Sequence, residues 1–344
     1  MIKRFILTLW LFLVITIILS QSVPGEYPQY LYDKDDSLQA GQNELTIYVI
    51  PSTVKYDWSS PHTLYKSYLK NCIRNLFKKE SYLLGHAFIE LRSPLFPQGI
   101  FTGIRSASRK EQKDLVLKQH YGLSILGADT EGKFETDIDL EQKVNKFSRK
   151  GQLAFMTFYI SDEAAERMIR FFKSYKADTD SNECHGVRYG GAFWPRYKGE
   201  GAGCSAFAVS FLDLAGILED EFDEWLVEIN IPMELIGGPY NHYNEVRLSD
   251  IKKHESWCVD NDTSDYEHFE IYDPTLMYEW IQGVWYKQNL QDVLTVTPVQ
   301  LNHAKGIRID GRNLPVPEDE SIFMEREKPS IFIDYYHQKL MTGK

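Results

Sequence analysis

The sequence has few cysteines for its length and fewer basic than acidic residues. Four cysteines in 344 residues are too few for a disulfide scaffold, so a hydrophobic core has to hold the fold. The chain carries 38 lysines and arginines against 49 aspartates and glutamates, a net charge of −11. This balance argues against binding nucleic acid or anionic lipid through general electrostatics. The sequence also lacks a GxGxxG after a strand, a Walker loop, HExxH and GxSxG, so nucleotide-dependent chemistry and HExxH-type zinc proteolysis are not indicated.

A single long apolar run lies at the N-terminus. Lys3 and Arg4 precede apolar residues 5–19, a stretch shorter than the roughly 20 residues that cross a bilayer. The run fits the core of a secretory signal peptide, and small residues favour cleavage after Ser22. An uncleaved anchor helix is the alternative. We expect an exported chain, periplasmic, on the outer surface or secreted, with no membrane span once residues 1–22 are removed.

The hydrophobic pattern predicts an α+β fold. Hydrophobic content is 43%, charged content is 25%, and aromatic content is high at 14%. Alternating or continuous apolar runs predict strands at 45–50, 84–91, 100–104, 153–160, 226–231 and 269–272. Helical spacing and capping residues predict helices at 61–77, after Ser161, at 204–218 and from 273 to 285.

The remaining stretches have weaker hydrophobic patterns. Two of them mark the predicted domain boundaries. Residues 105–150 are polar and predict loops with one or two edge strands. Residues 23–43 predict a loose leader, because they are rich in Pro, Tyr, Asp and Gly. The main domain is expected at 44–288, followed by a C-terminal extension at 289–344.

The most informative feature is Cys204, which begins an apolar helix after a glycine-rich approach at 199–203. Glycines let the backbone pass close to a ligand. The helix N-terminus stabilises an anion, so a thiol there ionises more readily. The same N–H groups can bind the oxyanion that forms when an acyl group is attacked. The alternative is a small buried cysteine or one half of a disulfide.

A thiolate needs a base, and His86 is the best placed of nine histidines. It lies in a predicted strand, where the ring orientation is fixed, and Gly85 removes a side chain beside it. The third, orienting group is expected from the partner strand, where Thr102 is the best local candidate. The alternative is a half-buried histidine with no role in chemistry.

GHAFIEL at 85–91 followed by GCSAFAVSFLDLAGI at 203–217 resembles the circularly permuted papain-like cysteine hydrolases. These include NlpC-type and lecithin:retinol acyltransferase-like proteins, in which the His strand precedes the Cys helix. The resemblance covers about 84–218. It implies a papain-like antiparallel sheet packed on a buried helix with Cys at its N-terminus. It also implies Cys204 as the nucleophile and His86 as the base.

Together these features predict an exported thiol-dependent hydrolase or acyltransferase, similar to a thiol protease, that acts on an amide or ester. A cell-wall peptide is the first expected substrate and a lipid ester the second. Tyr197 and Tyr189, in the loop before the cysteine, are candidates to line the cleft or donate to the oxyanion. No cofactor and no metal are expected.

Two other interpretations stay open. Cys184-His185 with His254 and Cys258 could bind zinc, although their spacing matches no closed zinc set, and a Cys184–Cys258 disulfide is an easier explanation for the two cysteines. The chain could also be a non-catalytic exported binding or surface protein with a papain-like shell. A recognition groove would then involve residues 189–197 and 240–243.

Overall fold

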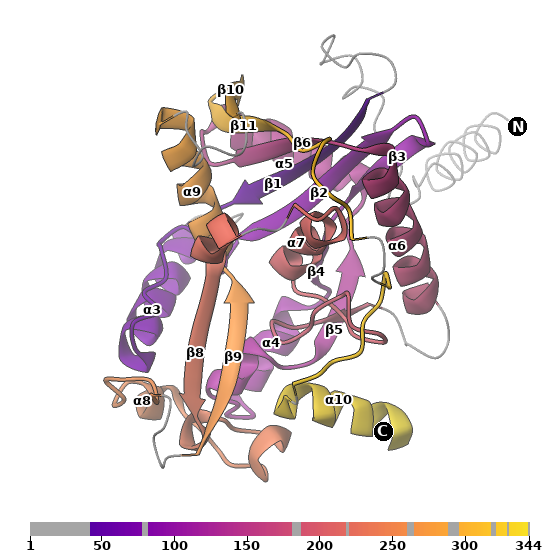
Figure 1. The fold of residues 1–344 in the computed structure, drawn as a ribbon. Helices are drawn as coiled ribbons and strands as arrows, with labels where there is room; N and C mark the ends of the chain where they lie inside the picture. The colour runs from indigo at the N-terminus through magenta and orange to yellow at the C-terminus, as the bar shows by residue number, and fades with distance from the viewer. Residues whose placement is uncertain are drawn as a thin grey trace, which may run out of the picture.

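A computed structural model gives the arrangement of most of the chain (Figure 1). It describes residues 42–77, 82–180, 187–217, 220–259, 265–287, 296–317, 321–328 and 330–342. The predicted signal segment and nearly all of the predicted leader lie outside the described residues. Within the described residues, no helix is both long and apolar enough to cross a membrane.

A six-stranded sheet forms the centre of the fold, in the order β10-β11-β6-β1-β2-β3. Its strands are β1 (Asn43–Ile50), β2 (His86–Ser93), β3 (Phe96–Thr102), β6 (Ala154–Ile160), β10 (Val296–Leu301) and β11 (Ala304–Asp310). Neighbouring strands are antiparallel except β11 and β6, which are parallel. The prediction of an antiparallel sheet therefore needs correcting to a mixed sheet, within a fold that is α+β as predicted.

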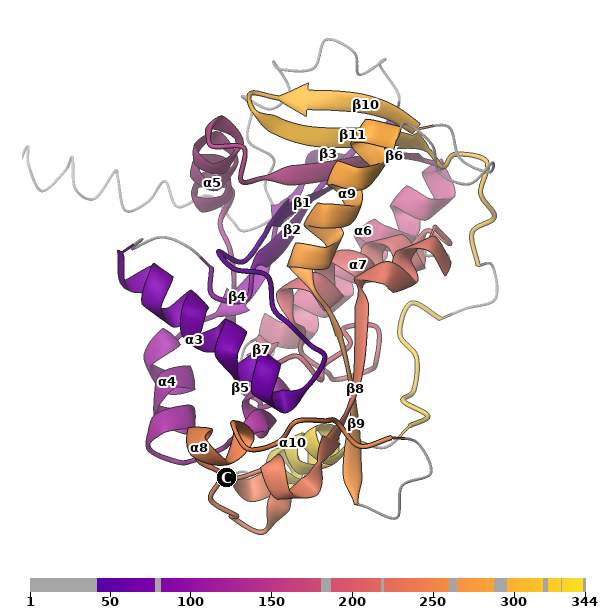
Figure 2. The same ribbon diagram turned by 90° about the vertical axis from the view of Figure 1, so that its left-hand side faces the viewer.

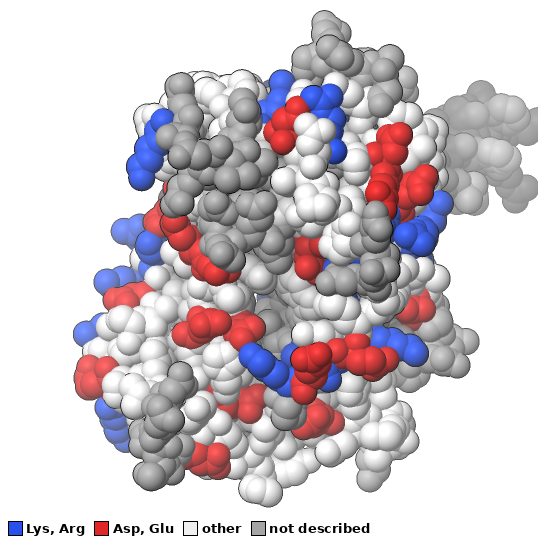
Figure 3. All heavy atoms as spheres, viewed as in Figure 1, with Lys and Arg blue, Asp and Glu red and all other residues white. Residues whose placement is uncertain are grey.

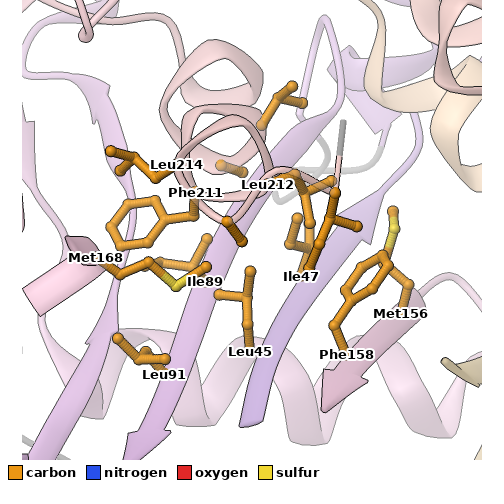
Figure 4. Packing of buried hydrophobic residues seen from close by; sticks show 14 of the residues in the cluster. Leu45, Ile47, Ile89, Leu91, Met156, Phe158, Met168, Phe211, Leu212 and Leu214 are labelled. Carbon is orange, nitrogen blue, oxygen red and sulfur yellow. The ribbon is translucent and has the colours of Figure 1, made fainter. Parts of the chain in front are cut away.

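Helices cover both faces of this sheet. On one face lie α6 (Asp162–Asp180), α7 (Cys204–Leu214) and α9 (Pro274–Lys287), and on the other lies α5 (Asp137–Arg149), as Figure 2 shows. The larger core lies under α7, which is buried and packs on β2. Figure 4 shows leucines, isoleucines, methionines and phenylalanines from β1, β2, β6, α6 and α7 meeting there. The nearly all-apolar sequence of α7 follows from this central position.

Two smaller sheets stand beside the central one. The first contains β4 (Ile104–Ser106), β5 (Thr130–Phe134) and β7 (Arg188–Tyr189), and the second is the antiparallel pair β8 (Leu226–Pro232) and β9 (Tyr266–Tyr272). The other α-helices are α3 (Pro61–Phe77), α4 (Arg109–Leu117), α8 (Leu248–Ile251) and α10 (Ile331–Thr342). Short 3-10 helices are η1 (Leu123–Leu126), η2 (Asp220–Trp225), η3 (Met233–Leu235) and η4 (Pro239–Asn241).

The sequence prediction was wrong for residues 105–150. They contain α4 and α5 as well as β4 and β5, rather than loops and edge strands alone. The hydroxyl of Thr136 caps α5 by accepting from the backbone N–H of Asp139 at 3.2 Å. Residues at helical spacing, Leu140, Val144 and Phe147, bury one face of α5. The polar remainder of the helix obscured this stripe.

The C-terminal residues are part of the same body rather than an appendage. β11 pairs with β6 in the central sheet, and β10 pairs with β11. Phe332 of α10 packs in a core cluster with residues of β8 and β9. Residues from the predicted C-terminal extension thus contribute strands to the central sheet and a helix to a core cluster.

Candidate active site

Cys204 occupies the first position of α7, where the backbone N–H groups of the first turn are not used by the helix. Its thiol is free and the residue is 9% exposed. The preceding loop needs glycine for packing, because a Cβ on Gly201 would lie 2.1 Å from the carbonyl oxygen of Arg188. That contact fixes the loop against β7 just before the cysteine.

His86 begins β2, and its imidazole is almost fully buried, with 1% of the side chain exposed. The ring of Tyr82 stacks on it, with centroids 4.4 Å apart and planes inclined by 13°. Glycine is required at position 85 by the backbone conformation and by a close contact, not to leave space beside the imidazole ring. The φ of Gly85 is +81°, and a Cβ would lie 2.9 Å from the Cβ of Pro274. The imidazole is thus held by its strand and by an aromatic neighbour.

The structure brings Cys204 and His86 together. His86 and Cys204 lie close enough for each to displace the pKa of the other, and the backbone N–H of Ala87 also favours the thiolate. The Nε2 atom of His86 is bonded to Glu135, so Nδ1 is the ring nitrogen left for the sulfur. A strand and a helix far apart in the sequence therefore supply an adjacent base and nucleophile.

Glu135 is the third group of the site, and the sequence did not suggest it. Its Oε2 lies 2.5 Å from Nε2 of His86, and its side chain is fully buried. Glu135 directly follows β5, and its backbone N–H donates to the carbonyl of Gly103 at 2.8 Å. A Cβ on Gly103 would lie 2.7 Å from Cβ of Phe88 and 2.9 Å from Oε2 of Glu135, so glycine makes room for both side chains.

Thr102 does not orient the histidine, and this expectation is corrected. It pairs in register with Ile89, further along β2 than His86. Its hydroxyl donates to the backbone carbonyl of Glu135 at 3.1 Å. Thr102 therefore supports the residue that contacts His86, and does not contact the imidazole itself.

Electrostatics favour a thiolate–imidazolium pair. Burial on its own lowers the pKa of His86, but the charge of Glu135 and hydrogen bonds to Cys204 and Glu135 outweigh burial and raise the pKa to about 9. Burial on its own raises the pKa of the Cys204 thiol, but the hydrogen bond and charge of His86 outweigh it and lower the pKa. Burial likewise opposes ionisation of Glu135, yet His86 and then Lys143 lower its pKa to about 2.

The two candidate tyrosines lie in different places. The hydroxyl of Tyr189 points at Cys204, with its oxygen 4.0 Å from Sγ. Burial, and then Cys204, raises the pKa of Tyr189 well above its usual range, so this hydroxyl stays protonated and can donate. Tyr197 lines the same cavity, but its ring packs 4.4 Å from the guanidinium of Arg326. Of the two tyrosines, Tyr189 is the one at the sulfur, where Oγ of Ser205 also lies 3.9 Å from Sγ.

Cys204 opens into a cavity of about 750 Å³. Its walls mix aromatic and acidic side chains, including Trp58, Tyr189, Trp194, Tyr197, Glu267, Phe269, Glu270, Tyr272, Glu325 and Glu327. Figure 3 shows acidic and basic side chains bordering a hollow in the middle of one face. The cavity is large enough for a small-molecule or peptide ligand.

One wall of the cavity comes from residues 321–328 and is tied to the loop before the cysteine. Arg326 forms two charge-assisted hydrogen bonds with Glu200, at 2.6 and 2.8 Å, and Glu200 is buried. The backbone N–H of Met324 donates to the carbonyl of Arg196 at 2.7 Å. The C-terminal part of the chain thus helps to hold the loop that leads to Cys204.

The zinc interpretation finds no test in the structure. Cys184 and His185 lie outside the described residues, and so does the suggested disulfide between Cys184 and Cys258. Elsewhere, the ligand atoms of Glu228, His268 and Glu270 lie within 4.8 Å of one another on the exposed face of β8 and β9. His268 bonds there to Asn230 and Glu270, each at 2.9 Å.

Comparison of the chain with protein-family models, curated proteins and solved structures finds no match. The interpretation of the site therefore depends on its own geometry.

Proposed function

We propose that this chain is a thiol-dependent hydrolase or acyltransferase that acts on an amide or ester. The observation that carries the proposal is the line of side chains Cys204–His86–Glu135 at the edge of an open cavity. A nucleophile, a base and a group that orients the base are the parts of a catalytic triad. Their pKa values are displaced in the directions that this chemistry needs.

The proposed reaction begins with attack of the Cys204 thiolate on a carbonyl carbon. The backbone N–H of Cys204 and the hydroxyl of Tyr189 stabilise the negative charge that develops on the carbonyl oxygen. The imidazolium of His86 gives its Nδ1 proton to the leaving group, whose bond to the acyl carbon breaks. Neutral His86 then takes a proton from water or a second acceptor, which attacks the thioester and releases the acyl group.

A papain-like fold of the circularly permuted type is part of the proposal. It is supported by the chain order, in which the histidine strand precedes the cysteine helix, and by the packing of α7 on β2. It is also supported by the local sequence at 203–207. The parallel β11–β6 pair within the central sheet, and the separate β8–β9 sheet beside it, differ from the simple antiparallel sheet expected at first.

The proposed enzyme is exported, and its proposed substrate is a cell-wall peptide first and a lipid ester second. The proposed export rests on the signal-like segment at 1–22. Acidic side chains outnumber the basic Arg326 and Lys328 in the lining of the same cavity, and aromatic rings accompany them, a mixture that suits a peptide with cationic and apolar parts. A lipid ester would use only the aromatic part.

The proposal is tested by labelling the full chain with an alkyne derivative of iodoacetamide at pH 7 and mapping the label by mass spectrometry. We expect the label at Cys204 and its loss in Cys204→Ala. Cys72→Ala is the matched control, because Cys72 is another free thiol and is half-buried. Equal labelling of wild type and Cys204→Ala would contradict the proposal and would favour a non-catalytic binding protein.

A further inference from the structure

Glu135 is shared between His86 and a second cation, Lys143 of α5. Oε2 of Glu135 bonds to His86, while Oε1 forms an ion pair with Nζ of Lys143. The Lys143 ammonium also lies 5.6 Å from the centre of the Tyr82 ring, which stacks on His86. Lys143 therefore contacts both the carboxylate and the aromatic ring that hold the imidazole.

This arrangement matters because His86 cannot stay charged throughout the proposed reaction. When the imidazolium gives its Nδ1 proton to the leaving group, it becomes neutral, and Glu135 loses its charged neighbour. A fully buried carboxylate without a cation is costly. The cost would oppose proton transfer at the very step in which the leaving group departs.

We propose that Lys143 is a positioning residue that stays paired with Glu135 when His86 gives up its proton, and so makes that proton transfer easier. This inference rests on the proposed function, because it concerns the same proton. Lys143 suits the task because its side chain is only 20% exposed and its partner is fully buried. Surface ion pairs contribute little, but a pair with one buried partner is only weakly screened by water.

The other charged groups around the site do not replace Lys143. Arg105 of β4 has its Nε 3.6 Å from the same Oε1 of Glu135, and its side chain is 35% exposed. Arg109 of α4 acts on Tyr82 rather than directly on the carboxylate. The other side chains against His86 include Cys204 and the rings of Tyr82 and Phe88, and Tyr189 also interacts with Glu135. Lys143 is thus the closest permanent cation on Glu135 among the described residues.

The test is a pH titration of His86 in the full chain. It is monitored by NMR, with the histidines labelled with ¹³C at Cε1. The signal of His86 is identified by its absence in His86→Gln. We expect Lys143→Gln, which removes the charge but keeps an N–H donor, to move the His86 midpoint upward from about 9 by about 1 pH unit. The midpoint rises because Glu135, without Lys143, holds the imidazolium proton more tightly.

Two variants serve as controls and one as a second test. Lys143→Arg keeps the charge, and Lys150→Gln neutralises an exposed lysine at the end of the same helix, so both should titrate like the wild type. Arg105→Gln should move the midpoint upward by less than 1 pH unit, and a rise of 1 pH unit or more would mean that Arg105, rather than Lys143, is the main cation on Glu135, even if Lys143→Gln does not fold. An unchanged or lowered midpoint in folded Lys143→Gln would overturn the inference. That result would leave Cys204 labelling intact, whereas failure of the proposed function would abolish labelling specific to Cys204.

Discussion

Replacing Glu135 with glutamine is the most direct perturbation of the charge balance at Cys204. Glutamine has nearly the same shape and can still accept a hydrogen bond from His86, but it carries no charge. In the native chain, the pKa of His86 is raised from 6.5 to about 9. This difference corresponds to about 3 kcal/mol in favour of the imidazolium, because one pKa unit is about 1.4 kcal/mol.

We expect Glu135→Gln to lower the pKa of His86 by about 1 to 2 units, which is the usual effect of a lost opposite charge at this range. The imidazolium exists below the pKa of His86 and is lost above it, so the variant loses it at a lower pH than the native chain. The balance between the ion pair and the neutral thiol–imidazole pair then moves about 10- to 100-fold toward the neutral pair. The fraction of Cys204 that is present as thiolate at pH 7 falls by a corresponding amount.

The measurement is the rate of Cys204 alkylation by iodoacetamide between pH 5 and 10, followed on the Cys204 peptide by mass spectrometry. Only the thiolate reacts, so the rate at neutral pH should fall and the acid limb of the profile should move to higher pH. Glu131→Gln is the matched control, since Glu131 lies in the same strand β5 but is exposed. A Glu135→Gln profile that coincides with that of Glu131→Gln would refute the reasoning.

Two further predictions concern the residues that support the site. Gly103→Ala should displace the Glu135 carboxylate, because the new Cβ would lie 2.7 Å from Cβ of Phe88 and 2.9 Å from Oε2 of Glu135, of which the carboxylate is the more easily moved; the variant should slow Cys204 alkylation at pH 7 as Glu135→Gln does. Urea unfolding checks that the variant is still folded. If the folded variant is alkylated at Cys204 as fast as the wild type, Gly103 is not needed to place the Glu135 carboxylate. Arg326→Met should leave the buried carboxylate of Glu200 without its cation and lower the free energy of unfolding by about 3 kcal/mol. A loss below about 0.5 kcal/mol in urea titration would mean that this pair contributes only what an exposed pair does.

Much of the central sheet and the place of Cys204 could be predicted from the sequence. β1, β6 and α7 are nearly continuous apolar segments with sharp ends, and such segments have few alternatives to burial. The sequence predicted a helix at 204–218, which extends beyond the observed end of α7. The helix ends at Leu214, because Gly216 has a φ of +67°, which suits the end of a helix.

Glu135 could not be predicted in the same way, because its role depends on where β5 runs. The sequence pointed to the strand paired with β2, and hence to Thr102. The chain instead leaves β3 at Gly103, and β4 then pairs with β5 in a separate sheet. This change of sheet carries Glu135 to His86, and no local pattern encodes it. The cap at Thr136 and the buried stripe of α5 were signals that a helix begins directly after Glu135.

The parallel pairing of β11 with β6 has a consequence for how the chain is made. Until the residues of β11 leave the ribosome, β6 offers a free edge whose N–H and C=O groups can pair with another chain. Such late, long-range pairing is also slow, because the intervening chain has to close a large loop first. The sheet beneath Cys204 is therefore complete only after residues 304–310 have been synthesised, and the edge of β6 is exposed to pairing with other chains until then.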